Sequence, residues 1–253
     1  MRDTNEHQER FLFVSWRDES GSIHPIGLLR RRTGASGDSY AFSYLKGAEH
    51  LDGFEALPGL QDLHALHQSP TLFPVFSNRV MPRSRPDYDL LASRLDLSGD
   101  ADPFEVLART GGRRATDRIE VFAEPRLMGD ERSCVVFFAR GIRHVTGAAD
   151  AVGQLRSGER LVLVDDTTNA HNPRAIVLRA SDGQQIGWVP DYLVEHIHEL
   201  RQLNHAEPVV EVEHVNDLSV APHMRLLCRL SAPWPEGYRP FSGPEFQTLA
   251  PLR

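Results

Sequence analysis

A loop rich in hydrogen-bonding side chains, DDTTNAHNPR at residues 165–174, is the first candidate for chemistry in this chain. It lies between two short apolar runs, residues 161–164 and 175–178. A third run at residues 186–189 follows an Asp-Gly hairpin signal and ends at Pro190. This pattern predicts a β-meander of three strands that presents the polar loop from a rigid scaffold, which is a common way to build a binding site.

Two acids open this loop, and paired carboxylates can bind the divalent ion of a nuclease. Asp165 and Asp166 are adjacent at the end of a predicted strand, however, so their side chains should point in opposite directions. Two closely spaced histidine pairs lack a third ligand at a suitable spacing. These pairs are His64 with His67 and His196 with His198. A kinase needs a Gly-rich phosphate loop, a paired lysine and metal-binding acids, and the only lysine, Lys46, lies in a predicted loop. We therefore predict no catalytic residue, no metal site and no cofactor.

The overall composition is that of a globular protein, with 40% hydrophobic and 25% charged residues and a mean hydropathy of −0.37. No apolar run approaches the ~20 residues of a membrane span, and the polar start of the chain does not resemble a signal peptide. We therefore expect a cytoplasmic protein. Cys134 and Cys228 lie far apart in apolar runs, which predicts buried free thiols.

The net charge of −7 argues against nonspecific coating of nucleic acid. The charge is nevertheless uneven along the chain. Residues 140–179 contain six arginines and four acids, a net charge of +2, whereas residues 182–217 contain eight acids and one arginine, a net charge of −7. A polyanion bound by the C-terminal half should therefore contact the first of these two stretches.

The elements around the polar loop predict an α+β protein with two unlike domains. In the N-terminal part, apolar runs at residues 11–16, 26–32, 40–44 and 119–122 predict a mixed antiparallel sheet with helices. Asp102, Pro103 and Glu105 form the signature of a helix start, and Gly111-Gly112 should end that helix. Residues 123–133 form the best linker, so we place domain 1 at residues 1–125 and domain 2 at residues 126–253.

The C-terminal part should add strands at residues 135–138, 209–215 and 224–230 to the meander, with a short helix at 148–155. Asp191 predicts the start of a longer helix. Its buried face should consist of Leu193, Val194, Ile197, Leu200 and Leu203. The Pro-rich tail from Ala232 either wraps a domain or reaches a partner.

Residues 135–230 resemble the HIRAN domain, whose core pattern is roughly L-x-L-V-R-E-P-x-N-P-x-D-x-N-A-I-x-V followed by G-x-x-I-G-Y-V-P. The corresponding segments here are LVLVDDTTNAHNPRAIVL and GQQIGWVP. The resemblance implies a small OB-like β-barrel with a helix that binds the 3′ end of single-stranded DNA. Stacking planes combined with phosphate donors suit such a ligand.

Carried over position by position, the resemblance implies a set of DNA-binding residues. Arg143 and His144 would lie on a DNA-facing strand, and Asn169, His171 and Asn172 would surround the terminal nucleotide. Trp188 would lie nearby, although an indole after glycine in a strand can equally be a core residue.

Three positions differ from the family pattern. Asp165 stands in place of an arginine, Asn172 in place of an aspartate, and Arg174 in place of an asparagine. The first change removes a phosphate contact and adds a repulsive charge, whereas Arg174 restores some positive charge.

Residues 11–122 resemble the N-terminal subdomain of HipA-type Ser/Thr kinases in the segments IGLLRRR, YAFSYLKGAEHL, LFPVFSNRVMP and DPFEVLARTGG. The chain has GGRRATD where that family has G-x-D-x-x-G. This resemblance implies a kinase partner and no catalysis, with Phe73 and Phe76 as candidate partner contacts, although both can equally be core residues. The sequence thus suggests a non-enzymatic adaptor of the toxin–antitoxin type that binds a HipA-like kinase and single-stranded DNA. The alternative is a DNA repair or processing accessory factor that needs no kinase.

Overall fold

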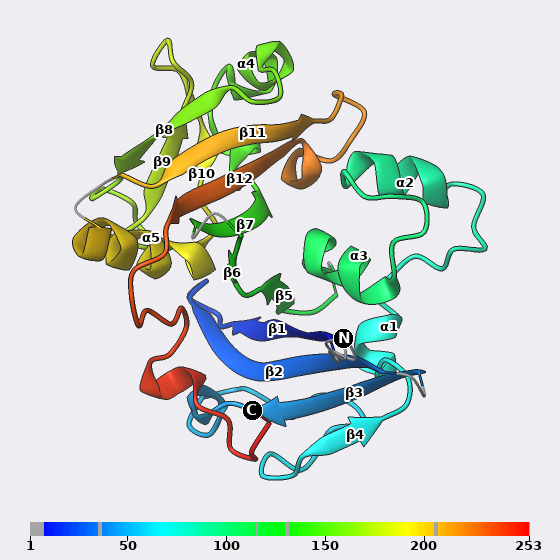
Figure 1. Cartoon of the computed structure of the whole chain (residues 1–253). Coiled ribbons are helices and arrows are strands. Elements are labelled where there is room, and N and C mark those ends of the chain that lie inside the picture. The colour runs from blue at the N-terminus through cyan, green and yellow to red at the C-terminus, as the bar shows by residue number, and fades with distance from the viewer. Residues whose placement is uncertain (1–7, 35–36, 115, 130–131, 205–206, 253) are drawn as a thin grey trace, which may run out of the picture. The chain divides into compact units, whose positions relative to one another are not determined.

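Two antiparallel sheets and several helices make up the structure, a computed structural model that describes residues 8–34, 37–114, 116–129, 132–204 and 207–252 (Figure 1). The predicted α+β class is confirmed. The first of two compact units takes the chain up to Pro86, Ala101–Glu124 and the tail from Phe241, and the second takes Asp87–Asp100 and Pro125–Pro240. The single predicted division at residue 125 assigned the segment 87–100 and the tail differently. None of the helices in the described ranges is long and apolar enough to cross a membrane.

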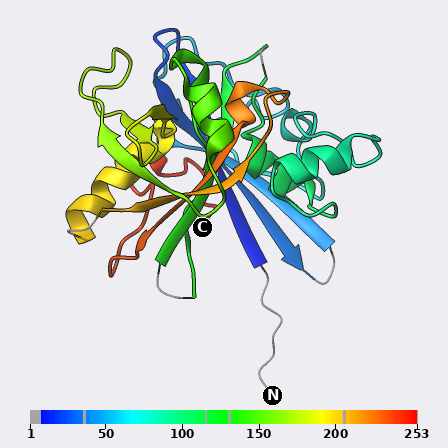
Figure 2. The same cartoon turned by 90° about the horizontal axis from the view of Figure 1, so that it is seen from above.

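The first unit is built on a five-stranded sheet in which β1, β2 and β3 lie side by side (Figures 1 and 2). The order is β4 (His67–Ser69), β3 (Gly37–Tyr44), β2 (Ile23–Gly34), β1 (Gln8–Arg17) and β5 (Ile119–Ala123). The strands at residues 11–16, 26–32, 40–44 and 119–122 therefore form as their apolar patterns predict, each within a longer or equal element.

One face of this sheet carries the main core of the first unit. Leu12, Val14 and Phe42 are buried there against α1 (Pro74–Ser77) and α3 (Pro103–Thr110). Phe73 and Phe76 belong to the same core, with only 8% and 0% of their surface exposed. The two predicted partner contacts are therefore core residues in this structure, because their rings are covered by their own unit.

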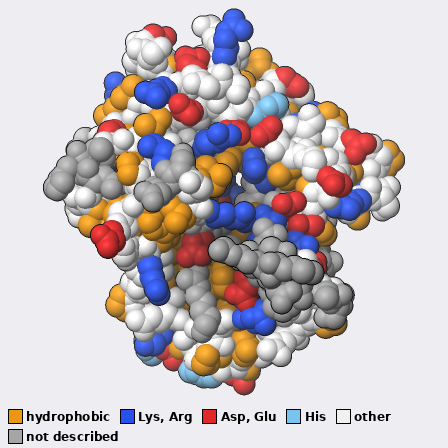
Figure 3. All heavy atoms as spheres, viewed as in Figure 1, with side chains coloured by type: hydrophobic (Ala, Val, Ile, Leu, Met, Phe, Trp, Pro, Cys, Tyr) orange, Lys and Arg blue, Asp and Glu red, His pale blue; other side chains and the backbone are white. Residues whose placement is uncertain are grey.

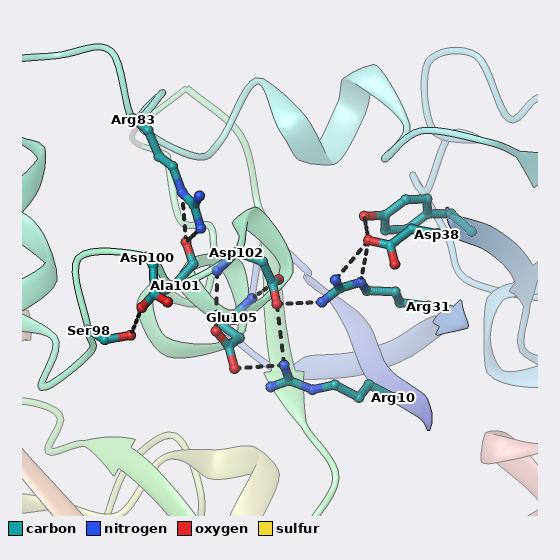
Figure 4. A network of polar contacts seen from close by, with 10 residues as sticks. Arg10, Arg31, Asp38, Arg83, Ser98, Asp100, Ala101, Asp102 and Glu105 are labelled. Carbon is teal, nitrogen blue, oxygen red and sulfur yellow. Dashed lines mark hydrogen bonds and ion pairs between the residues drawn. The ribbon is translucent and has the colours of Figure 1, made fainter. Parts of the chain in front are cut away.

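Helix α3 begins with the predicted capping signature (Figure 4). The Asp102 carboxylate accepts a hydrogen bond from the Glu105 backbone N–H (3.0 Å), and the Glu105 carboxylate accepts one from the Asp102 N–H (3.2 Å). Arg31 donates to Asp102, and Arg10 donates to Glu105 at 2.9 Å. Gly111 ends the helix at φ +71°, a left-handed conformation that favours glycine. The cap therefore also fixes α3 to β1 and β2.

The C-terminal tail lies on the other face of the first sheet. Phe13, which alternation points away from the main core, meets the ring of Phe241 edge-on at 5.2 Å and that of Phe246 at 5.4 Å. The Leu249 N–H donates to the Tyr44 carbonyl at 2.8 Å, so the tail continues the edge of β3. Of the two predictions for the tail, residues 241–252 follow the first and wrap a domain.

The second unit contains a seven-stranded antiparallel sheet that curls into a half-barrel. Its order is β10 (Gln185–Trp188), β9 (Ile176–Arg179), β8 (Arg160–Asp165), β11 (Val209–Val215), β12 (Leu226–Pro233), β7 (Arg132–Phe138) and β6 (Arg126–Leu127). Part of the predicted linker forms β6, and residues 130–131 of that linker lie outside the described residues. The curled sheet is consistent with the predicted OB-like architecture.

A two-residue bridge links the two ends of the curl. The Arg140 N–H donates to the Trp188 carbonyl at 2.8 Å, and the Trp188 N–H donates to the Arg140 carbonyl at 2.9 Å. Arg140 is the second residue after β7, so this bridge joins the chain beyond β7 to β10. A Cβ on Gly187 would lie 2.4 Å from the Arg140 oxygen, which explains why glycine precedes the tryptophan.

Three α-helices of the described residues belong to the second unit. They are α2 (Tyr88–Arg94), α4 (Ala148–Gln154) and α5 (Asp191–Asn204). The Asn216 side chain fixes the end of α2 by donating to the Arg94 carbonyl at 2.8 Å. The predicted inner face of α5 is buried except for Leu203, which is 53% exposed because the last turn extends past the packed region.

Candidate nucleic-acid interface

Three segments that are distant in the sequence meet at Trp188. The bridge to Arg140 places the following residue, Gly141, directly under the indole, where a Cβ would lie 2.5 Å from Trp188 Cε3. On another side, the indole Nε1 donates a hydrogen bond to Asp166 Oδ2 at 2.9 Å. Trp188 is only partly exposed. The covered part of the Trp188 ring fits the core interpretation, and its exposed part is open to a stacking base.

Asp166 is the hydrogen-bond acceptor that organises the polar loop. One carboxylate oxygen accepts from Trp188 and from Asn169 Nδ2 (3.2 Å), and the other accepts from the Thr168 hydroxyl (3.0 Å). The Trp188 N–H, followed by the Asn169 and Thr168 donors, holds the pKa of Asp166 below its ordinary value, because these bonds favour the ionised form. The start of the loop is therefore fixed to the meander.

Asparagine side chains shape the rest of the loop. Asn169 Oδ1 accepts from the backbone N–H groups of His171 (3.0 Å) and Asn172 (3.1 Å), and Asn172 Oδ1 accepts from the Arg174 N–H (2.9 Å). These are consecutive Asx turns. The turns use the asparagine oxygens, whereas the His171 ring is exposed. The structure thus brings Asn169, His171 and Asn172 together, as predicted.

Helix α5 provides partners for three side chains of this loop. Arg174 pairs with Glu195 at 2.7 Å, and Asn172 Nδ2 lies 3.4 Å from the Asp191 carboxylate. Arg201 pairs with Asp165 at 2.6 Å. Asp165 and Asp166 therefore point to different partners, as adjacent residues on a strand end should, and they do not converge on one point.

Arg143 and His144 lie in a short 3-10 helix, η2 (Ile142–His144), directly after Gly141. The predicted DNA-facing strand is therefore a helical turn, because Gly141 adopts φ +70° and ends the extended conformation. Both side chains are exposed. Arg143 Nε donates to His144 Nε2 at 3.0 Å, an arrangement that requires this histidine nitrogen to be unprotonated.

The outer face of the meander provides apolar surface beside these groups. Strand pairing aligns Val164, Val177 and Trp188 in one row, and the neighbouring row contains Val162 and Arg179. Val162 is 52% exposed. Val177 is only 5% exposed, and Val164 and Trp188 are partly exposed. The apolar surface open to a nucleotide base therefore consists of Val162 and parts of Val164 and Trp188, with Arg179 opposite Val162 as a phosphate donor. Across the face of the molecule that Figure 3 shows, basic and acidic side chains are intermixed.

Sequence reasoning did not predict the roles of two residues of this site. Asp166 accepts the hydrogen bond of the Trp188 indole. Its position directly before a loop rich in asparagine could have indicated a role as a hydrogen-bond acceptor. Arg201 pairs with Asp165 from 36 residues away, and no local pattern indicates such a pair. In the described part of the chain no group of three or more His, Cys, Asp or Glu residues could hold a metal ion.

Comparisons with known proteins bear on the second unit. Residues 133–234 match the family model of the HIRAN domain. Among solved structures, a protein from Lactobacillus plantarum is 16% identical with a TM-score of 0.33, and the match covers 40% of this chain and 97% of that chain. The HIRAN domain of human HLTF is 16% identical with a TM-score of 0.29, and the match covers 41% of this chain and 78% of that one. No curated protein matches this chain. The predicted HIRAN domain is thus confirmed by the family match, whereas the HipA-type resemblance gains no support.

Proposed function

We propose that the HIRAN domain of this chain binds DNA, and that its ligand is the 3′ end of a single strand. The observation that carries this proposal is the meeting of η2, the Asx-turn loop and β10 at Trp188, within the segment that matches the family. The binding residues would be those predicted from the sequence. They are Arg143, His144, Asn169, His171, Asn172, Arg174 and Trp188.

The indole is suited to receive a base because it is already fixed. Gly141 supports the ring and Asp166 holds its N–H, so little conformational entropy is lost when a base stacks on the exposed part. Stacking on an aromatic side chain contributes about 1–3 kcal/mol per base in single-strand binders. Arg143 offers guanidinium donors to a phosphate next to this ring.

Affinity should be moderate, because acids compete for the same cations. The Arg174–Glu195 pair is half exposed on both sides, and such pairs contribute about 0–1 kcal/mol. Arg174 can therefore turn to a phosphate at small cost. Asp165 is less available for repulsion than its charge suggests, because Arg201 lies 2.6 Å from it.

Fluorescence anisotropy with the full chain tests this proposal. Labelled oligonucleotides of one sequence would carry either a free 3′-hydroxyl or a 3′-phosphate. We expect tighter binding of the free end and a roughly tenfold loss of affinity in Arg143→Ala, which corresponds to one phosphate contact of about 1.4 kcal/mol. Equal binding of both ends would refute end recognition, and no binding would refute the function.

Arg160→Ala is the matched control, since it removes the same charge from the same unit. Arg160 lies at the opposite end of β8, five residues and therefore about 16 Å from the loop. Its binding should equal that of the unchanged chain. If both substitutions weaken binding equally, the interaction is nonspecific attraction to arginine and not a site at η2.

We further propose that this binding involves no catalysis by the chain, because Asp165 and Asp166 are directed to Arg201 and Trp188. A DNA repair or processing accessory factor fits such a binding function. We leave the HipA-like kinase partner and a toxin–antitoxin role out of this proposal, since Phe73 and Phe76 lie in the core of the first unit.

A further inference from the structure

A small cavity in the first unit is lined by four arginines. Its volume is about 100 Å³, and its charged lining consists of Arg17, Arg113, Arg114, Arg118, Asp117 and Glu120. The net charge of this lining is +2, in a chain whose net charge is −7. The cavity includes the two arginines of GGRRATD, the segment that departs from the HipA-type pattern.

Local structure explains why the arginines converge. Strands β1 and β5 pair up to Trp16 and Ile119, and the Arg17 N–H donates to the Arg118 carbonyl at 2.9 Å, so these two arginines leave neighbouring strand ends. Arg113 and Arg114 follow the glycine turn that ends α3. Strand pairing and the helix end thus bring the four residues to one cavity.

The acids near the cavity offset only part of its arginine charge. Both oxygens of Asp117 accept from Arg79, at 3.0 and 2.6 Å, so Asp117 is balanced by a fifth arginine. Arg118 lies 3.5 Å from Glu19, which is 89% exposed, and such a pair contributes little. Glu120 is the other acid of the lining and is buried. The cavity therefore has an excess of positive charge.

Backbone carbonyls, which carry no net charge, hold two of the guanidinium groups in place. Arg17 donates to the Gly21 carbonyl at 2.5 Å, and Arg114 donates to the Asn78 carbonyl. The Arg113, Arg114 and Arg118 side chains are exposed, so a ligand can reach them from solvent. Held guanidinium groups lose less entropy when they bind an anion.

We propose that this cavity binds a single phosphate group. Arginine forks match the geometry of phosphate oxygens, and the volume of about 100 Å³ leaves no room for a nucleoside. The phosphate can be free or can be the terminal group of a nucleotide whose remainder lies outside the cavity. This site is independent of the proposed DNA function, because its lining belongs entirely to the first unit.

Isothermal titration calorimetry of the full chain at constant ionic strength tests the site with inorganic phosphate, thymidine 5′-monophosphate and thymidine as probes. We expect saturable binding of one phosphate or one monophosphate per chain and none of thymidine. Binding of inorganic phosphate identifies the free anion as a sufficient ligand, whereas binding of the monophosphate alone identifies a nucleotide terminus; both support the proposal. Binding of neither overturns it.

Arg114→Ala and Arg118→Ala should each raise the dissociation constant at least fivefold, and melting curves would verify that both variants fold. Arg32→Ala is the control, since Arg32 is also an exposed arginine of the first unit but lies nine residues, about 30 Å, along β2 from Ile23 at the cavity. Binding that is unchanged in both cavity variants, or reduced equally in Arg32→Ala, would overturn the proposal.

Discussion

Replacing Gly187 by alanine should open the half-barrel at its bridge. The added Cβ would lie 2.4 Å from the Arg140 carbonyl oxygen, whereas ordinary van der Waals contact begins at 3.4 Å. The obstacle is backbone, so β10 and the chain after β7 must separate by about 1 Å to accept the methyl group. That separation breaks both hydrogen bonds of the Arg140–Trp188 bridge, which measure 2.8 and 2.9 Å.

The magnitude follows from these contacts. Overpacking a well-packed site costs about 1–3 kcal/mol, and each hydrogen bond contributes about 0.5–1.5 kcal/mol. Moving β10 away from Arg140 relieves the clash but weakens the two hydrogen bonds of the bridge, so the overpacking and hydrogen-bond energies do not simply add. We expect Gly187→Ala to lower the free energy of unfolding by about 2–4 kcal/mol, a large part of the 5–15 kcal/mol typical of native proteins. DNA binding should fall as well, since Trp188 and Gly141 separate with the bridge.

Urea denaturation followed by circular dichroism measures this effect as a lower midpoint at an unchanged slope. Gly153→Ala is the matched control, because Gly153 lies in α4 and a Cβ added there would meet open space, with no atom of the described residues beyond its own helix within 4 Å. It should be neutral or stabilise by up to about 1 kcal/mol through helix propensity. An unchanged midpoint in Gly187→Ala would show that the bridge does not hold the curled sheet together.

Substitutions at three further positions test the electrostatics of both units. Asp166→Asn should remove an acid-sensitive part of the stability: hydrogen bonds from Trp188 and the loop keep the folded pKa of Asp166 below that of the unfolded chain, so this stabilisation is present above about pH 4 and lost as the pH falls through the folded pKa. Urea midpoints between pH 3 and 7 should therefore change less in the variant. Burial lowers the pKa of His196 from 6.5 to about 4, so the unfolded chain takes up the proton first as the pH falls. The free energy of unfolding should therefore fall by up to about 3 kcal/mol between pH 6.5 and 4. His196→Gln should flatten this dependence on pH, and an unchanged dependence would contradict the prediction. Asp102→Ala removes both the cap of α3 and one of the two carboxylates that pair with Arg31, and should cost about 2–3 kcal/mol in thermal or urea unfolding. Asp102→Asn retains the cap and should cost about 1 kcal/mol; equal losses would assign the effect to charge alone.

Local patterns predicted the elements of the fold because the causes of those elements are local. Alternating apolar residues placed β1, β2 and β3, and Asp102 with Glu105 placed the start of α3, since each signal acts within a few residues. The same reasoning placed Leu203 on the buried face of α5. Periodicity continues to the end of a helix, however, whether or not the surface that it packs against extends as far.

Assignments that depend on distant contacts could not be read in this way. The Pro-rich tail begins at Ala232, and contacts of Phe241 and Phe246 with the distant Phe13 reveal that its last part covers the first sheet. The composition of the segment around Phe73 and Phe76 suits an exposed binding loop as well as a core segment. Burial decided between those two interpretations, and burial is a property of the assembled unit.

The candidate site shows how such contacts alter a functional argument. Read alone, Asp165 in place of an arginine subtracts a phosphate contact and adds repulsion. In the structure Arg201 pairs with Asp165 and also with Glu207, so the three side chains retain a net charge of −1 instead of two separate negative charges. The Asp165 carboxylate faces Arg201 of α5. Arg143, by contrast, follows Gly141, which the Arg140–Trp188 bridge places against the indole ring. An incoming strand that follows η2 and the exposed indole therefore meets a cation first, which is why the altered loop is compatible with binding of a DNA end.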